Sequence, residues 1–140
     1  MRIMAIDYGD AHTGIAISDP TGLLAGFTTT INAYRPELVV ERITALAREH
    51  GVEELVLGHP RNMDGTRGPR AEKAESLAEL LRSSVGLPVT LWDERRTTID
   101  AHQILFKAGK NAQQRKKTVD AVAASLILEG YLTYKKSQNA

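Results

Sequence analysis

Three acidic residues in separate parts of the chain, Asp7, Glu94 and Asp120, are the strongest candidates for chemistry. Asp7 follows the short apolar run at 3–6 and is itself followed by two spaced glycines, of which Gly9 is the first. A carboxylate at the end of a buried strand is costly to desolvate unless a cation or a hydrogen-bond donor compensates it. Nearby glycines let a phosphate group or a metal ion approach the backbone. The stretch around Asp7 therefore predicts the edge of an active site.

Each acid also has a simpler explanation when it is considered alone. Asp7 could form a turn, Glu94 could pair with a neighbouring arginine, and Asp120 could favour the start of a helix through the helix dipole. Three acids that converge from separate elements would, however, repel one another strongly without a cation. Their convergence at one edge would therefore favour a metal site.

The residue types indicate which metal and which reaction such a site would support. Carboxylate oxygens in a chain with no cysteine and only four histidines suit Mg²⁺ or Mn²⁺ better than zinc. Two such ions could activate a water molecule and stabilise the leaving oxygen of a phosphodiester. The three acids therefore predict metal-dependent hydrolysis, and whether Asp93 contributes is left open.

Further residues near these acids could hold a substrate. Arginines can orient a nucleic-acid backbone through bidentate phosphate contacts without reading its sequence. Two of the histidines, His50 and His102, are interpreted as structural, whereas the other two could contact phosphate. The residues predicted to bind substrate are Gly9, His12, His59, Asn62, Arg67, Arg70, Arg95, Arg96 and Thr98.

The first third of the chain has the pattern of three short strands. These are predicted at 2–6, 14–18 and 23–31, and a Pro-Thr-Gly turn signal follows Asp19. Asp10, Asp19 and Asp64 lie in turn-like sequences, and we interpret them first as turn formers. Strands joined by short turns pair antiparallel, so we expect an antiparallel meander.

The rest of the chain alternates helices with two strands. Apolar residues recur at helical spacing from position 36 to about 51, and again over 70–81. Short apolar strands are predicted at 52–57 and 89–92. Thr97 or Thr98 could cap a helix that continues through 106, and Thr118 could cap the last helix, which is predicted to end near 134.

Together these elements predict one α/β domain over residues 1–140, with a flexible tail from about 136. The fold would be a mixed sheet of five strands, three antiparallel and then two parallel, flanked by helices. Ligands of such sheets collect at the carboxyl ends of the strands. Asp7, the segment 58–65 and the pair Asp93 and Glu94 would all lie at such ends, so we expect them to share one cleft. Trp92 is interpreted as a core residue that could also stack a base at the rim.

Composition limits the class of protein. The proportions of hydrophobic and charged residues, 42% and 25%, are those of an ordinary globular domain. The absence of cysteine excludes a disulfide, a thiol nucleophile and a Cys-ligated metal. No apolar run is long enough to span a bilayer, and no signal-peptide pattern opens the chain. We therefore expect a soluble cytoplasmic protein with no membrane partner.

Charge is distributed unevenly along the chain. From Arg95 to the end there are nine Lys or Arg against three Asp or Glu, whereas the rest of the chain carries nine against fourteen. A protein that meets a polyanion along one side would benefit from such a split. Solvated helix faces and a basic tail explain the same split equally well.

Four motifs occur in order through almost the whole chain. They are Asp7-x-Gly9-x-x-x-x-Gly14-Ile15-Ala16-x-Ser18-Asp19, Gly58-His59-Pro60-x-Asn62-Met63-Asp64-Gly65, Asp93-Glu94-Arg95-x-Thr97-Thr98 and Asp120-x-x-Ala123-Ala124-x-x-Ile127-Leu128. In this arrangement the sequence resembles the YqgF (RuvX) family. The resemblance implies an RNase H-like fold, relatedness to RuvC-type Holliday junction resolvases, and a bacterial nuclease that matures the 5′ end of pre-16S rRNA. It also implies divalent-metal catalysis, with Asp7, Glu94 and Asp120 as the acidic triad.

Two positions depart from the pattern of the family. Members commonly have Lys-Arg where this chain has Ala11-His12, and Gly-Leu-Pro where it has Gly58-His59-Pro60. The acidic set is intact, so these changes concern the grip on substrate near Asp7 and not the chemistry.

The leading hypothesis is a metal-dependent endonuclease that acts on structured or single-stranded RNA. A second hypothesis is a junction-resolving nuclease for branched DNA, which would act as a homodimer with two sites. A third is an actin-like or sugar-kinase-like nucleotide-binding module, since these proteins share the acid-glycine-glycine opening. A fourth is a nucleic-acid-binding or ribosome-associated module that does not cut.

Overall fold

The fold is a five-stranded mixed sheet between two helical layers. A computed structural model describes residues 1–21, 25–62, 64–94 and 112–138. The strands lie in the order β3-β2-β1-β4-β5. The elements are β1 (Arg2–Asp7), β2 (His12–Ser18), β3 (Ala25–Asn32), α1 (Pro36–His50), β4 (Val52–His59), α2 (Pro69–Val85), β5 (Val89–Asp93) and α4 (Ala112–Gln138).

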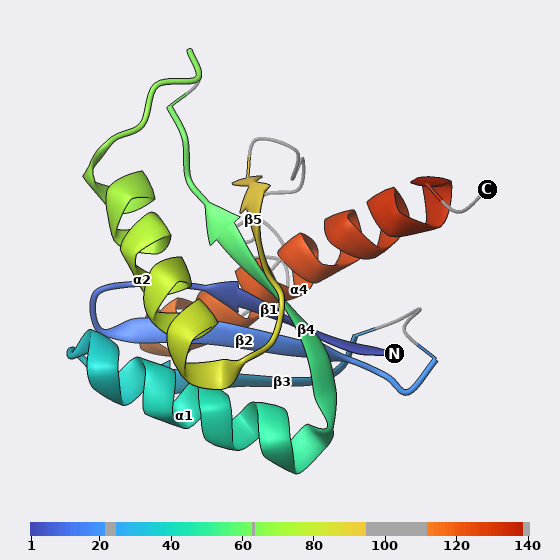
Figure 1. The fold of residues 1–140 in the computed structure, drawn as a ribbon. Helices are drawn as coiled ribbons and strands as arrows, with labels where there is room; N and C mark the ends of the chain where they lie inside the picture. Colours follow the sequence, from blue (N-terminus) through green and yellow to red (C-terminus); the bar gives the residue numbers. More distant parts are fainter. Residues whose placement is uncertain (22–24, 63, 95–111, 139–140) are drawn as a thin grey trace.

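The strand pairing confirms the predicted topology. β1 pairs antiparallel with β2, and β2 pairs antiparallel with β3. β1 also pairs with β4, and β4 with β5, both in parallel. Figure 1 shows α1 and α2 on one face of the sheet and α4 on the other. The carboxyl ends of β1, β4 and β5 therefore meet at one edge of the sheet, as the sequence predicts.

Alternation along β1 divides the core between the two faces. Met4 and Ile6 are buried in the cluster formed with α1 and α2, whereas Ile3 and Ala5 are buried in the cluster formed with α4. Successive side chains of a strand point to opposite faces, so Asp7, which continues the series of Ile3 and Ala5, belongs to the α4 face. The local pattern of the sequence thus decides on which side of the sheet the acid lies.

Helix α4 is held on its face by an apolar stripe and by a polar anchor. Its buried residues recur at helical spacing: Ala124, Ile127, Leu128 and Tyr131. At the amino-terminal end of β4, the buried Glu54 accepts hydrogen bonds from the hydroxyl of Tyr131 and, at 2.8 Å, from Nζ of Lys135. Burial and the bond to Glu54 raise the pKa of Tyr131 to about 12. The anchor ties the carboxyl-terminal part of α4 to the start of β4.

The last helix differs from its prediction at both ends. It begins by Ala112, so Thr118 lies inside the helix and is not its cap. The intervening residues at 113–117 are Gln, Gln, Arg, Lys and Lys, which are strong helix formers without a stop signal. The helix continues to Gln138, beyond the predicted start of a tail at 136, because Lys135 and Lys136 suit the negative end of the helix dipole. The helix predicted from Thr97 or Thr98 through 106 lies outside the described residues.

None of the helices in the described part of the chain is long and apolar enough to cross a membrane.

Gly51 ends α1 in the left-handed conformation, with φ of 65°. A Cβ at this position would meet no atom within 4 Å, so an alanine would introduce backbone strain without a clash. We expect Gly51→Ala to lower the free energy of unfolding by about 1 kcal/mol and to leave any activity unchanged. Urea unfolding would measure the change. A protein as stable as the original would contradict the assigned role of Gly51.

Candidate active site

The acids Asp7 and Glu94 meet at the carboxyl ends of β1 and β5. Gly58 of β4 pairs with Trp92 of β5, and the buried Trp92 packs with the α4 face. Glu94 directly follows β5, and its Oε1 lies over Gly58 on the face where Ile127 of α4 packs. Since Ile6 pairs with Leu57, Asp7 lies next to Gly58 in the ladder. Three neighbouring strands therefore bring Asp7, Gly58 and Glu94 to one place.

Direct contacts confirm this juxtaposition. The side chains of Asp7 and Glu94 lie within hydrogen-bonding reach of each other, and such a bond forms only while one of the two carboxyl groups carries a proton. A Cβ built on Gly58 would overlap Oε1 of Glu94 and lie 2.8 Å from Cδ1 of Ile127. The glycine thus provides the space in which the Glu94 carboxylate lies.

Burial and mutual repulsion both disfavour two negative charges here. Burial raises the pKa of Asp7, against the hydrogen bond from Glu94 and the charge of Arg70. Burial, followed by the charge of Asp7, raises the pKa of Glu94 to about 7. In the described residues no ion pair joins Arg70 to either acid, and Arg70 is exposed. Among the residues that the structure describes, the pair therefore has no arginine partner, and it fits a divalent cation, which would stabilise both carboxylates.

The third predicted acid, Asp120, belongs to α4, but its side chain lies outside the described residues. The helical period places position 120 one turn before Ala124 and two turns before Ile127, both of which are buried on the sheet. This spacing agrees with the prediction that Asp120 begins the buried stripe. Its contact with the other acids stays a prediction, and no group of three potential ligands occurs among the side chains that are described.

Gly58 offers a test of how closely the carboxylate must be held. In a Gly58→Ala protein the new methyl group would push Glu94 away from Asp7 and press on Ile127. If the site cleaves phosphodiesters, as the sequence predicts, we expect the rate of cleavage to fall about 100-fold, because a displacement of a catalytic group by about 1 Å can lower a rate that much. We also expect unfolding to become easier by about 1–3 kcal/mol through overpacking. Cleavage assays and thermal melts would measure both effects, and undiminished cleavage would contradict the assignment.

The sequence predicts that the strand ends at residue 57, which would leave His59 in a loop. The structure instead makes His59 the last residue of β4, with only 4% of the residue exposed. Its Nε2 lies 2.6 Å from Oε2 of Glu75, and Nε of Arg61 donates to its Nδ1 at 3.3 Å. Oε1 of the same Glu75 accepts a hydrogen bond of 3.0 Å from Arg67. Both ring nitrogens are therefore occupied by protein groups, and the structure places His59 under the β4–α2 loop and not at its surface.

The rest of that loop is folded on itself. Residues Arg61 and Arg67 form an isolated antiparallel bridge. Between them, Asn62 donates to Thr66, and Asp64 accepts from both the backbone and the hydroxyl of Thr66. The interpretation of Asp64 as a turn former is confirmed, and Asn62, predicted to bind substrate, also serves the turn.

The turn between β1 and β2 contains two other predicted contacts. A Cβ on Gly9 would overlap the carbonyl oxygen of His12, so this turn requires glycine. Nδ1 of His12 lies 2.6 Å from Oδ1 of Asn32. Asp10 pairs at 2.7 Å with Lys73 of α2. Both Gly9 and His12 thus lie at the same sheet edge as Asp7. The remaining predicted residues, Arg95, Arg96 and Thr98, lie outside the described residues.

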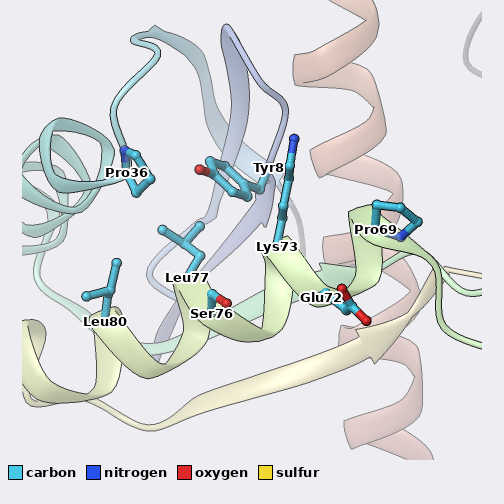
Figure 2. A pocket seen from close by; sticks show the side chains of 8 residues that line it. All are labelled: Tyr8, Pro36, Pro69, Glu72, Lys73, Ser76, Leu77 and Leu80. Carbon is cyan, nitrogen blue, oxygen red and sulfur yellow. The ribbon is translucent and has the colours of Figure 1, made fainter.

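A pocket of about 370 Å³ lies on the opposite face of the sheet, between α1 and α2 (Figure 2). Tyr8 follows Asp7 in sequence and turns its ring toward Leu77 and Pro36 (Figure 2). Glu72 and Lys73 both line this pocket, and the charges of Lys73, Asp10 and Glu37 act on Tyr8. The pocket is separate from the site of the acids because the sheet lies between them.

Sequence reasoning missed Glu75. It lies on the inward side of α2, four residues after the buried Ala71 and three before the buried Ala78. An acid in an alanine-rich buried stripe was the available signal. Its partners could not be known without the fold.

Fold and acid pair together define the class. RuvC of T. thermophilus, solved with a Holliday junction substrate, matches with a TM-score of 0.64 and 14% identity over 96% of this chain and 96% of that one. The chain therefore has the RNase H-like fold of RuvC. A family model described as RuvX, Holliday junction resolvase, matches residues 1–134, and the chain belongs to that family.

Individual proteins agree with this family. A protein of Halothermothrix orenii, named as a candidate pre-16S rRNA nuclease, is 46% identical over 134 residues, which is 96% of each chain. These relationships confirm the family and the nuclease class that the sequence predicts. A ROK hexokinase from Thermus thermophilus matches with a TM-score of 0.50 and 19% identity over 74% of this chain but only 38% of the kinase. That likeness shows a common fold and does not support the sugar-kinase alternative.

Proposed function

We propose that this protein is a divalent-metal-dependent endonuclease that processes the 5′ end of pre-16S rRNA in the cytoplasm. The observation that carries the proposal is the contact between Asp7 and Glu94 at the ends of two separate strands. Two neighbouring half-buried carboxylates do not stabilise a fold, so their presence indicates a functional site. The names of the relatives support RNA as the substrate class.

Asp7, Glu94 and Asp120 are the residues that would hold Mg²⁺ or Mn²⁺. Bound at this place, the metal would neutralise negative charge. It would also lower the pKa of a water molecule, so that hydroxide could attack a phosphodiester. The chain itself supplies the two carboxylates in contact and the exposed guanidinium of Arg70, close enough to influence both. Arg70 would orient a backbone phosphate toward the acids.

The proposal is tested with a precursor RNA that spans the 5′ end of 16S rRNA. We expect specific cleavage with Mg²⁺ or Mn²⁺, none with EDTA, and recovery when excess metal is restored. Binding of the RNA without cleavage under any of these conditions would instead favour a non-catalytic module.

Resolution of branched DNA is the second candidate, favoured by the description of the family and by the RuvC likeness. Cutting a symmetric four-way junction calls for two sites in a homodimer. Sedimentation with and without a synthetic junction, together with cleavage of both substrates, would separate the candidates. Symmetric cuts in the junction by a dimer would favour DNA, whereas a monomer that cuts only RNA would favour rRNA processing.

A further inference from the structure

We propose that Glu75 is a positioning residue that holds the arginines of the β4–α2 loop ready for the phosphates of the substrate. This inference rests on the proposed nuclease function. The loop comprises residues 60–68, of which 63 lies outside the described residues. Figure 1 shows that it extends beyond the ends of the strands, beside the start of α2.

Glu75 binds two side chains directly and a third through one of them. One carboxylate oxygen lies 2.6 Å from Nε2 of His59, and the other accepts from Nη1 of Arg67 at 3.0 Å. Because Arg61 can only donate, Nδ1 of His59 must accept, and the imidazole proton lies on Nε2 facing Glu75. A single acid of α2 thus determines the orientation of His59, Arg61 and Arg67.

The location of this network gives it a functional consequence. His59 pairs with Asp93, the residue before Glu94, so the network begins at the same strand ends as the acid pair, on the α2 side of the sheet, whereas the acids lie on the α4 side. Arg67 has 52% of its side chain exposed although it is tied to Glu75, and Arg61 is exposed as well. A guanidinium fixed by one carboxylate retains further N–H donors for a phosphate.

Holding these side chains in advance lowers the entropic cost of binding. An arginine that must be ordered by its ligand loses part of the interaction free energy to the lost freedom of its side chain. An exposed ion pair alone contributes little to stability, so a pair that served only stability would not need a buried histidine on the same carboxylate. The burial of His59 and the exposure of both arginines therefore indicate a role in presenting cations.

The test measures RNA binding as a function of salt, in an Asp7→Asn background that prevents cleavage. The probe is a fluorescent precursor rRNA fragment. In this background, adding Glu75→Ala or Arg67→Ala should each weaken binding about 10-fold and reduce the slope of log affinity against log salt by about one. When both substitutions are combined, the loss of RNA affinity should be no greater than with Arg67→Ala alone, because the two residues act as one unit. In the active protein, Glu75→Ala should raise KM and leave kcat within about threefold.

Matched variants separate positioning from folding. Glu79→Ala removes an exposed acid one turn further along α2, which pairs with Arg82 at 2.8 Å, and should leave the salt slope unchanged. Glu75→Gln keeps an acceptor for His59 and should preserve folding, yet it cannot satisfy His59 and Arg67 with two anionic oxygens, so an intermediate loss is expected.

The outcomes distinguish the inference from the function on which it rests. An unchanged salt slope in Glu75→Ala and Glu75→Gln, with only a lower melting temperature, would overturn the positioning role while the nuclease assignment stands. Additive losses in the double variant would do the same. If the parent protein neither binds nor cuts the RNA, the proposed function fails, and this inference fails with it.

Discussion

Replacing Asp7 with Asn is expected to reduce phosphodiester cleavage by about 10³-fold or more without unfolding the protein. Asn has nearly the same size and can retain a hydrogen bond to Glu94, but it carries no negative charge with which to hold a metal ion. Burial makes a negative charge at position 7 unfavourable without a cation, and the hydrogen bond with Glu94 and the charge of Arg70 offset only part of this cost. The variant should therefore melt at the same temperature as the original or higher in EDTA.

The control for this variant is an acid three residues further along. Asp10 is exposed and pairs with Lys73 on the surface, so Asp10→Asn removes a carboxylate from the same turn without touching the acid pair. It should leave cleavage within about twofold and stability within about 1 kcal/mol. Cleavage kinetics with precursor RNA, together with thermal melts, compare the two. Equal activity in both variants would end the case for hydrolysis at Asp7.

The sequence predicts the sheet and one part of the site because these depend on local patterns. The apolar run before Asp7 is sufficient to place the acid at the end of a strand, whereas its position on the α4 face follows only from the structure, which shows α4 packed on Ile3 and Ala5. The position of Glu94 at a strand end is predicted in the same way, from the strand that ends in Trp92 and Asp93. The parallel order then brings both ends together, since helical crossovers leave few other arrangements.

What the sequence does not predict depends on contacts between distant residues. β4 continues through His59 because Asp93 pairs with it, and nothing in the local sequence shows that β5 reaches this far. The role of Glu75 depends on a partner sixteen residues earlier in the chain. The start of α4 was misplaced because Thr118 is a good cap locally, whereas the helix formers before it allow an earlier start. Local propensity identifies elements better than it identifies their ends.

Glu94→Gln should have opposite effects on activity and on the stability of the metal-free protein. Loss of a charged ligand should lower cleavage by about 100-fold or more. The folded pKa of Glu94 is about 7, above the ordinary value of 4.5, so the folded protein binds a proton more tightly than the unfolded chain does. The resulting stability is fully present below pH 4.5 and is lost as the pH rises through 7.

Gln resembles the protonated acid at every pH and removes this dependence. In EDTA we expect the variant to match the original protein near pH 5 and to exceed its stability at pH 8 by on the order of 2 kcal/mol. Melting temperatures from pH 5 to 8 would measure the difference. Glu53→Gln, which removes an exposed carboxylate from β4, is the control and should follow the original protein throughout.

Metal should reverse the order of stability, because a cation stabilises the same carboxylates that the proton otherwise neutralises. Mn²⁺ at pH 8 should raise the melting temperature of the original protein more than that of Glu94→Gln, since a ligand that binds only the folded state stabilises it in proportion to its affinity. Parallel pH profiles for the two proteins in EDTA would show that Glu94 carries no unfavourable charge. Equal shifts with Mn²⁺ would show that Glu94 does not hold the metal, and the acid pair would then lose its explanation.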